Sequence, residues 1–151
     1  MLQDYVVFAV ATNSPINDMV AIHTKQAPYN TYVIGGRVPA GSVTRALYWD
    51  TPDPYHYVRL SGDVLIVGGE DHKTGHEEDP SERHVRLERW TRERFPMAQQ
   101  VEYRWSGQGL EPVDYVSYAG KNPGNEHIFV VTGDSGEGLS NGVAASLILR
   151  D

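Results

Sequence analysis

The segment Ile128–Gly142 has the residue pattern best suited to binding a negatively charged group. A strand is expected at Ile128–Thr132, followed by a loop with glycines at 133, 136 and 138 and a helix from Gly138 to Arg150. Glycine adopts positive φ angles and lets a ligand approach the backbone closely. The first N–H groups of a helix and its positive dipole end attract an anion. The same pattern fits an ordinary strand-to-helix turn, and both interpretations stay open at this point.

A second group of chemically useful side chains lies on the predicted strand Tyr55–Leu60, the first arm of an antiparallel hairpin. Because side chains alternate along a strand, Tyr55, Tyr57 and Arg59 share one face. They could line a binding pocket, but plain sheet packing also explains the tyrosines, and an ion pair also explains Arg59. His56 lies on the opposite face, so a catalytic role for it has no support.

The segment from Gly69 to Asp79 contains His72 and His76 among several carboxylates. Imidazole and carboxylate groups bind several divalent metal ions. However, this stretch has the composition of a loop and lacks the helix that would place the two histidines on one face. We therefore interpret it as a solvated acidic loop and expect no metal site.

The central helix has a clear start signal at Asp79, a residue type that caps helices, followed by Pro80 in the first helical position. Pro96 ends the helix. Its core face is expected to carry Leu87, Trp90 and Phe95. The expected i,i+4 ion pairs on its outer side are Glu82–Arg86 and Glu88–Arg92.

The remaining elements are predicted to be strands. The continuous apolar run at Tyr5–Val10 predicts a strand that is buried on both faces between parallel neighbours. The other predicted strands are Tyr29–Arg37, Ala46–Trp49, Val101–Trp105 and Tyr115–Ala119. This order predicts an α+β fold, in which an antiparallel sheet with one main helix is flanked by strand and strand–helix pieces of an incomplete α/β domain. The expected divisions are residues 1–20, 21–110 and 111–151.

Composition narrows the possible partners of this 151-residue chain. A formal net charge of −7 without a basic run argues against nucleic acid and anionic membranes. The chain has no cysteine, so disulfides and thiolate metal sites are excluded within it. No segment approaches the ~20 apolar residues that span a bilayer, and the N-terminus does not read as a signal peptide. We expect a soluble, cytoplasmic protein.

Three segments, in this order, resemble the later part of the D-amino-acid oxidase-like family of FAD enzymes, which includes glycine oxidase and sarcosine oxidase. Val6–Thr12 resembles a late strand of the FAD domain, with Asn13 in place of a glycine. Trp105–Gly120 resembles the family's W-x-G-L-R-P segment, and Thr132–Gly142 resembles its closing T-G-H-x-x-x-G turn, with Asp134 in place of histidine. Tyr48–Gly75 resembles a subgroup in which a Rieske iron–sulfur domain follows the flavin domain.

The resemblance implies FAD as the cofactor. The pyrimidine side of the flavin ring would lie against the loop from Gly133 to Gly138. The positive end of the helix that follows would stabilise the negative charge of the reduced flavin there. The implied cofactor-binding residues are Thr12, Gly133, Asp134, Ser135, Gly136, Glu137 and Gly138.

The resemblance also implies that Tyr55, Tyr57 and Arg59 line the substrate pocket. Glu111 stands where many relatives have an arginine that holds the substrate carboxylate. A carboxylate at this position favours an ammonium group instead. The substrate is therefore expected to be an amine, or an amino acid whose carboxylate is held by Arg59 or Arg104.

The implied reaction is the transfer of hydride to flavin from the C–H bond next to an amine nitrogen, which gives an imine that water hydrolyses. No catalytic residue is assigned. The rival interpretation is a non-catalytic binding or assembly module that uses the tyrosine-rich sheet as an interface.

A G-x-G-x-x-G motif, which such enzymes need for the dinucleotide, does not occur before residue 133. The expected partner is therefore an N-terminal FAD-binding half. By itself the chain is expected to bind FAD weakly or not at all, to be inactive or nearly so, and to expose an apolar patch that drives self-association.

Overall fold

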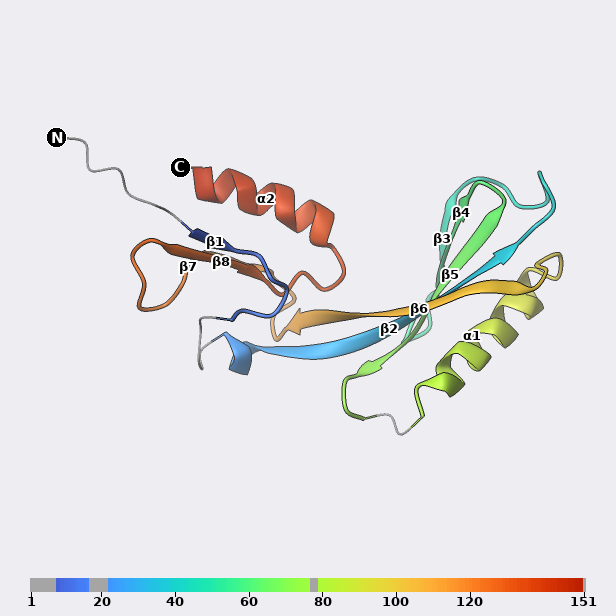
Figure 1. Ribbon diagram of the computed structural model, residues 1–151, viewed down its shortest axis with the longest axis horizontal. Coiled ribbons are helices and arrows are strands. Elements are labelled where there is room, and N and C mark those ends of the chain that lie inside the picture. Colours follow the sequence, from blue (N-terminus) through green and yellow to red (C-terminus); the bar gives the residue numbers. More distant parts are fainter. Residues whose placement is uncertain (1–7, 17–21, 77–78, 151) are drawn as a thin grey trace. The chain divides into compact units, whose positions relative to one another are not determined.

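A computed structural model describes residues 8–16, 22–76 and 79–150 of the chain (Figure 1). It has the predicted α+β fold and divides into two compact units. One unit contains the residues up to Pro28 and from Gly109 onward, and the other contains Tyr29–Gln108. Two long strands, β2 (Gln26–Arg37) and β6 (Val101–Pro112), include residues of both units.

The unit Tyr29–Gln108 is built on a five-stranded sheet with the strand order β3-β4-β5-β2-β6 (Figure 1). The shorter strands are β3 (Leu47–Trp49), β4 (Tyr57–Ser61) and β5 (Val64–Lys73). The pairs β3–β4, β4–β5 and β5–β2 are antiparallel, and Ser61 pairs with Val64 at the turn of the predicted hairpin. Two predictions are wrong in detail: β4 begins at Tyr57, so Tyr55 precedes the strand, and β5 extends to Lys73, so Gly69–Lys73 is strand rather than loop.

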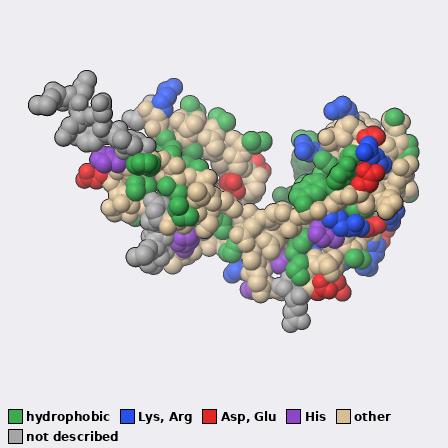
Figure 2. All heavy atoms as spheres, viewed as in Figure 1, with side chains coloured by type: hydrophobic (Ala, Val, Ile, Leu, Met, Phe, Trp, Pro, Cys, Tyr) green, Lys and Arg blue, Asp and Glu red, His purple; other side chains and the backbone are tan. Residues whose placement is uncertain are grey.

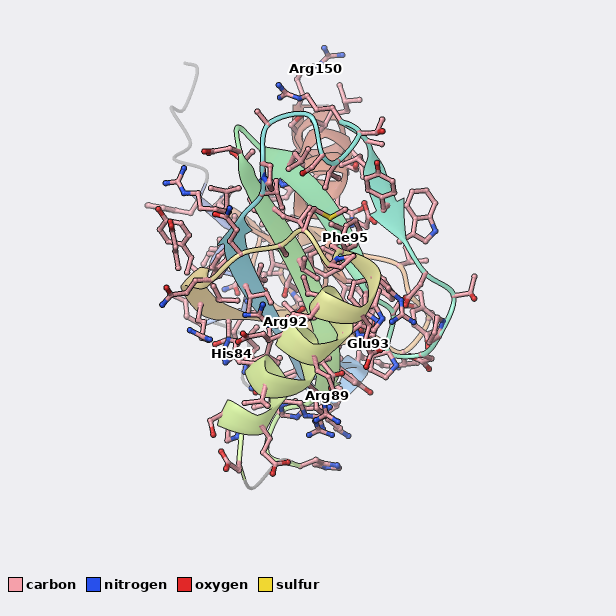
Figure 3. The ribbon with its side chains drawn as sticks, turned by 90° about the vertical axis from the view of Figure 1, so that its right-hand side faces the viewer. His84, Arg89, Arg92, Glu93, Phe95 and Arg150 are labelled. Atoms are coloured by element: carbon pink, nitrogen blue, oxygen red, sulfur yellow. The ribbon has the colours of Figure 1, made fainter. Side chains whose placement is uncertain are left out.

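Helix α1 (Ser81–Arg94) packs against one face of this sheet, as the view onto the helix in Figure 3 shows. We call this side of the sheet the helix face. The core there consists of Tyr32, Ile34, Val38, Val58, Leu65, Val67 and Leu87. Leu87 is fully buried, and Trp90 and Phe95 pack beside this core. The predicted core face of the helix is therefore confirmed.

Helix α1 begins at Ser81, one residue later than predicted, with Pro80 rather than Asp79 at the N-cap position, and its two predicted ion pairs are confirmed. One carboxylate oxygen of Asp79 accepts hydrogen bonds from the Ser81 backbone N–H at 3.0 Å and from the Ser81 hydroxyl at 2.6 Å. These bonds satisfy groups that a helix start leaves unpaired. The ion pairs join Arg86 to Glu82 at 3.9 Å and Arg92 to Glu88 at 2.7 Å.

The other unit contains a three-stranded sheet with the order β1-β8-β7. Its strands are β1 (Phe8–Val10), β7 (Tyr118–Lys121) and β8 (Ile128–Thr132). The unit also contains a short 3-10 helix (His23–Lys25) and helix α2 (Gly138–Arg150), which has the predicted bounds. β1 runs parallel to β8, so the predicted parallel neighbour is confirmed.

Three sequence predictions about strands are corrected here. Phe8 is 61% exposed and its neighbour Ala9 is also exposed, so the described residues of β1 are not buried on both faces; residues 5–7 lie outside the described part. β6 extends beyond Trp105 to Pro112, because its neighbour β2 is equally long and offers it backbone partners despite the glycines in this stretch. Tyr115 has a φ of +59°, which suits a turn, and the strand begins at Tyr118.

No helix in the described part of the chain is long and apolar enough to cross a membrane.

Candidate functional site

The ends of β1 and β8 bring Thr12 next to the glycine loop. The two strands are parallel, and Val10 pairs with Val130, so their carboxyl ends lie at the same edge of the sheet. The Thr132 hydroxyl donates to the carbonyl of Asn13 and ties the two loops together. Ligands of α/β folds commonly bind beyond the carboxyl ends of parallel strands. The structure therefore brings together the segments that the sequence predicted to bind a cofactor.

Gly133 and Gly136 serve this loop in two different ways. Gly133 has a φ of +73°, and a Cβ atom there would lie 2.7 Å from Cγ of Pro112, so only glycine fits. Gly136 has a φ of +83°, and nothing lies within 4 Å of the position that its Cβ would take. The backbone at Gly136 is thus open to close approach by a ligand.

The start of α2 offers unpaired backbone donors next to this loop. Asn141 donates its backbone N–H to the carbonyl of Glu137 at 2.9 Å. The amides that precede it, those of Gly138, Leu139 and Ser140, have no acceptor among the residues that the structure describes. Together with the dipole of a 13-residue helix, these amides favour a group that carries negative charge. The loop and the helix start therefore fit the electron-rich edge of a ring such as flavin.

Asp134 has a role that its sequence position did not reveal. Its carboxylate accepts a hydrogen bond from the Gly136 N–H at 3.2 Å. Its carbonyl accepts hydrogen bonds from the Glu137 N–H at 2.7 Å and from the Asn141 side chain at 3.1 Å. Asp134 thus fixes the shape of the loop, and its negative charge lies at the same helix end. This charge weakens the attraction of the site for a second negative group.

The predicted substrate-binding tyrosines lie together on the sheet side opposite α1. We call this side, which carries Thr31, Tyr57 and Arg59, the tyrosine face. The Tyr57 hydroxyl lies 3.2 Å from the Thr31 hydroxyl, and the ring covers Gly68, whose Cβ would lie 2.1 Å from Cζ of Tyr57. The rings of Tyr55 and Tyr57 are 6.1 Å apart. Arg59 is exposed two residues further along β4.

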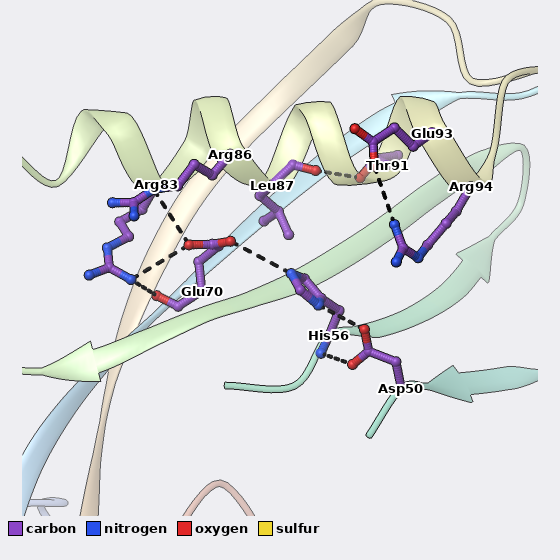
Figure 4. A network of polar contacts seen from close by, with 9 residues as sticks. All are labelled: Asp50, His56, Glu70, Arg83, Arg86, Leu87, Thr91, Glu93 and Arg94. Carbon is purple, nitrogen blue, oxygen red and sulfur yellow. Dashed lines mark hydrogen bonds and ion pairs between the residues drawn. The ribbon is translucent and has the colours of Figure 1, made fainter. Parts of the chain in front are cut away.

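His56 lies on the helix face, as alternation predicted, in a network of polar contacts (Figure 4). It is 8% exposed, its Nδ1 atom is 3.0 Å from Asp50, and its ring stacks on Trp90 at 4.3 Å. Nε2 of His56 is 3.7 Å from Glu70, which in turn lies 3.5 Å from Arg83 of α1. The network fastens the segment before β4 to the helix. Alternation was the one sequence signal for it.

Two further predictions can be compared with the structure. The Nε2 atom of His72 is 2.9 Å from the Tyr32 hydroxyl, and no metal-binding group of three or more His, Asp or Glu occurs within residues 8–16, 22–76 and 79–150.

Arg104 donates to Glu88 of α1 at 2.8 Å, so it lies on the helix face and cannot hold a substrate on the tyrosine face. Glu111 is half-buried in β6 and belongs to the unit of the glycine loop. Its role in substrate binding stays a prediction.

Comparison with solved structures shows the same fold in several enzymes. Glycine oxidase from Geobacillus kaustophilus gives a TM-score of 0.63 at 19% identity, over 84% of this chain and 36% of that one. L-proline dehydrogenase from P. horikoshii gives 0.65 at 14% identity, over 89% of this chain and 38% of that one. Glycine oxidase from Bacillus cereus ATCC 14579 gives 0.62 at 16% identity, over 81% and 34%. The chain thus spans little more than a third of the length of these structures.

No curated protein matches the chain. A protein-family model described as "FAD dependent oxidoreductase" (DAO) matches residues 3–151, which is nearly the whole sequence. The chain therefore belongs to the DAO family of FAD-dependent oxidoreductases.

Proposed function

We propose that this chain is the substrate-domain part of an FAD-dependent oxidoreductase that oxidises an amine or an amino acid. The observation that carries the proposal is the glycine loop at the joint carboxyl edge of β1 and β8, which opens a helix with unpaired amides, in a chain of this family. This arrangement provides space and partial positive charge for an electron-rich ring.

On the cofactor side, the backbone at Gly136 and the amides of Gly138 and Leu139 would hold the flavin ring, with Thr12 beside them. When bound, FAD supplies the hydride acceptor for the C–H bond next to the substrate nitrogen. Asp134 orients the loop and adds a negative charge, which disfavours the negatively charged reduced ring. The net charge at this helix start therefore helps to set how readily the cofactor is reduced.

On the substrate side, Tyr55 and Tyr57 offer aromatic and hydroxyl surface, and Arg59 offers a guanidinium group on the same face. In this proposal these three side chains position the substrate, while Glu111 favours a positively charged nitrogen over a carboxylate. The expected product is an imine, which water hydrolyses outside the redox step.

The proposed partner is an N-terminal FAD-binding half that carries the G-x-G-x-x-G motif. Support comes from the apolar surface of α2, part of the exposed hydrophobic surface visible in Figure 2, because large apolar patches mark interaction sites. Its exposed apolar side chains are Leu139, Val143, Leu147 and Ile148, of which Leu139 is 92% exposed. Without its partner, the chain would cover this surface by self-association.

The resemblance of Tyr48–Gly75 to the subgroup with a Rieske domain is the basis for proposing that such a domain follows in the complete enzyme. The cysteine-free sequence agrees with a reducing compartment, and we propose the cytoplasm.

The test mixes the purified chain with an N-terminal dinucleotide-binding half and FAD, and then separates the proteins by size. The mixture should give a yellow complex with one flavin per pair, whereas the chain alone should be colourless. Leu139→Asp and Val143→Asp, on the exposed face of α2, should prevent the complex from forming. Lys121→Asp, an exposed change on β7, is the matched control and should leave it intact.

Two results would overturn the proposal. One is a complex that forms without retaining flavin, and the other is tight stoichiometric FAD in the chain alone. The rival function, a non-catalytic assembly module, predicts a protein partner that binds the tyrosine face while no flavin is retained in any mixture.

A further inference from the structure

Strand β5 contains a β-bulge that decides which carboxylate reaches the tyrosine face. Tyr32 of β2 pairs with Gly69, and Asn30 pairs with His72, so one residue of β2 lies opposite two residues of β5. Thr31 is that one residue, and Glu70 and Asp71 are the two. A bulge of this kind turns the side chains that follow it to the other side of the sheet, and such bulges are common next to active sites.

The bulge exchanges the sides of Glu70 and Asp71. Gly69 pairs with Tyr32, whose side chain lies in the core of the helix face, so regular alternation would place Glu70 on the tyrosine face and Asp71 on the helix face. Instead, Glu70 has a φ of +59°, and its carboxylate contacts His56 and Arg83 on the helix side. Asp71 is thereby turned toward the tyrosine face.

Two electrostatic effects agree with this position of Asp71. Burial raises the pKa of Tyr57, and the negative charge of Asp71 raises it further, although the hydrogen bond with Thr31 lowers it in part. Burial also raises the pKa of the Asp71 carboxyl, while the Thr31 side chain and the two histidines His56 and His72 lower it only in part. Asp71 lies opposite Thr31 in the bulge, and the Thr31 hydroxyl lies 3.2 Å from the Tyr57 hydroxyl, so the three residues are neighbours.

Asp71 lacks a complete set of hydrogen-bond partners. Its Oδ1 atom is buried, and no donor within the described ranges of the chain bonds to it. No ion pair within those ranges joins it to Arg59, the cation that β4 places on this face. A buried carboxylate oxygen without a donor is destabilising, and a bound ligand that donates a hydrogen bond would satisfy it.

The surroundings of Asp71 suit a positively charged, partly apolar ligand. The Tyr57 ring lies over Gly68, whose Cβ would lie 2.1 Å from Cζ of Tyr57. Gly68 thus lets this aromatic ring lie against the sheet. The faces of aromatic rings attract cations, and Tyr55, at 6.1 Å from Tyr57, extends the aromatic surface.

We propose that Asp71, with the hydroxyls of Thr31 and Tyr57, forms a binding site for the positively charged nitrogen of an amine, and that Asp71 contributes to a preference for amine substrates. The assignment of this amine as the substrate rests on the proposed function. The binding of the amine to this site does not, since every residue of the site lies in the unit Tyr29–Gln108.

The test is an NMR titration of the 151-residue chain without flavin, using benzylamine, which is positively charged at neutral pH, and benzyl alcohol, its neutral analogue. Benzylamine should shift the signals of Thr31, Tyr57 and Asp71 in a saturable manner, and benzyl alcohol should not. Asp71→Asn keeps the size of the side chain and removes its charge. It should weaken benzylamine binding by about tenfold or more, since a hydrogen bond to a charged group contributes that much.

Asp63→Asn is the matched control, because Asp63 lies in the turn at the other end of the β4–β5 hairpin, and it should leave benzylamine binding unchanged. Loss of folding does not account for the expected loss of binding. The raised pKa of Asp71 means that its charged form destabilises the fold above that pKa, so Asp71→Asn should keep or raise the melting temperature at neutral pH.

Three outcomes would each refute the proposed amine site. They are NMR shifts with benzyl alcohol equal to those with benzylamine, an unchanged benzylamine affinity in Asp71→Asn, and no binding of benzylamine. These outcomes are distinct from failure of the proposed function. A complex that retains flavin while the chain binds no amine refutes only the amine site, and a chain that binds the amine but retains no flavin with any N-terminal half refutes only the flavoenzyme assignment.

Discussion

Replacing Gly68 with alanine should displace the Tyr57 ring from the tyrosine face. The new Cβ would lie 2.1 Å from Cζ and 2.4 Å from the hydroxyl oxygen of Tyr57, distances that no real contact allows, so the ring must move away. Movement breaks the hydrogen bond to Thr31 and exposes the covered side of the ring.

The expected change in stability follows from three contributions. The hydrogen bond contributes about 1 kcal/mol, and the packing of a half-buried ring contributes about 1 kcal/mol, half of what full burial gives. Alanine in a strand offsets this by roughly 0.5–1 kcal/mol relative to glycine. Gly68→Ala should therefore destabilise this unit by about 1–1.5 kcal/mol. In a Tyr57→Ala background the same change should instead stabilise it by roughly 0.5–1 kcal/mol.

Tryptophan fluorescence during urea unfolding measures this unit selectively, because Trp49, Trp90 and Trp105 all lie within it. A double-mutant cycle should give a coupling energy of about 2 kcal/mol between positions 57 and 68. Gly62→Ala is the control. Gly62 has a φ of +63° with open space around it, so its replacement should cost about 1–2 kcal/mol in both backgrounds. A coupling energy near zero would refute the placement of the ring.

Two other predictions concern the glycine loop and the His56 network. Gly133→Ala combines a left-handed backbone with a clash against Pro112 and should destabilise its unit by roughly 2–4 kcal/mol. Hydrogen exchange of the β8 amides measures this loss, and protection equal to that of the original chain would contradict it. Burial raises the pKa of Asp50, but the hydrogen bonds and charge of His56 outweigh burial and lower it overall, so its stabilisation is present above pH ~3.9 and is lost as the pH falls through the lowered pKa. Asp50→Asn should reduce stability at pH 7 and flatten the decline below pH ~3.9 in fluorescence-detected unfolding, and an unchanged acid decline would count against the network.

Local signals in the sequence determined much of the fold. Glycines in the loop and apolar residues beyond it predicted the bounds of helix α2 at Gly138 and Arg150, and Asp79 with Pro80 predicted the start of α1 to within one residue. Alternation correctly assigned Tyr57 and His56 to opposite faces of the sheet. These features depend on the preferences of a few neighbouring residues, which is why the sequence alone is sufficient to predict them.

Part of the candidate site could not be predicted in this way. The sequence placed Asp134 at the glycine loop, but only the folded loop shows that its carboxylate bonds to the backbone there. Arg104 remained a candidate to hold the substrate until the structure showed its bond to Glu88 on the helix side. Both outcomes depend on which groups long-range packing brings within hydrogen-bond distance.

The positions of Glu70 and Asp71 depended on tertiary structure alone. Because side chains alternate with a period of two, one extra residue in β5 reverses the side of every residue that follows. No local pattern marks that residue. The bulge arises where β5 pairs with β2 and where Glu70 meets Arg83 and His56, contacts between residues far apart in the sequence. The sequence thus determined which elements form, whereas their pairing decided which carboxylate lies beside the tyrosines.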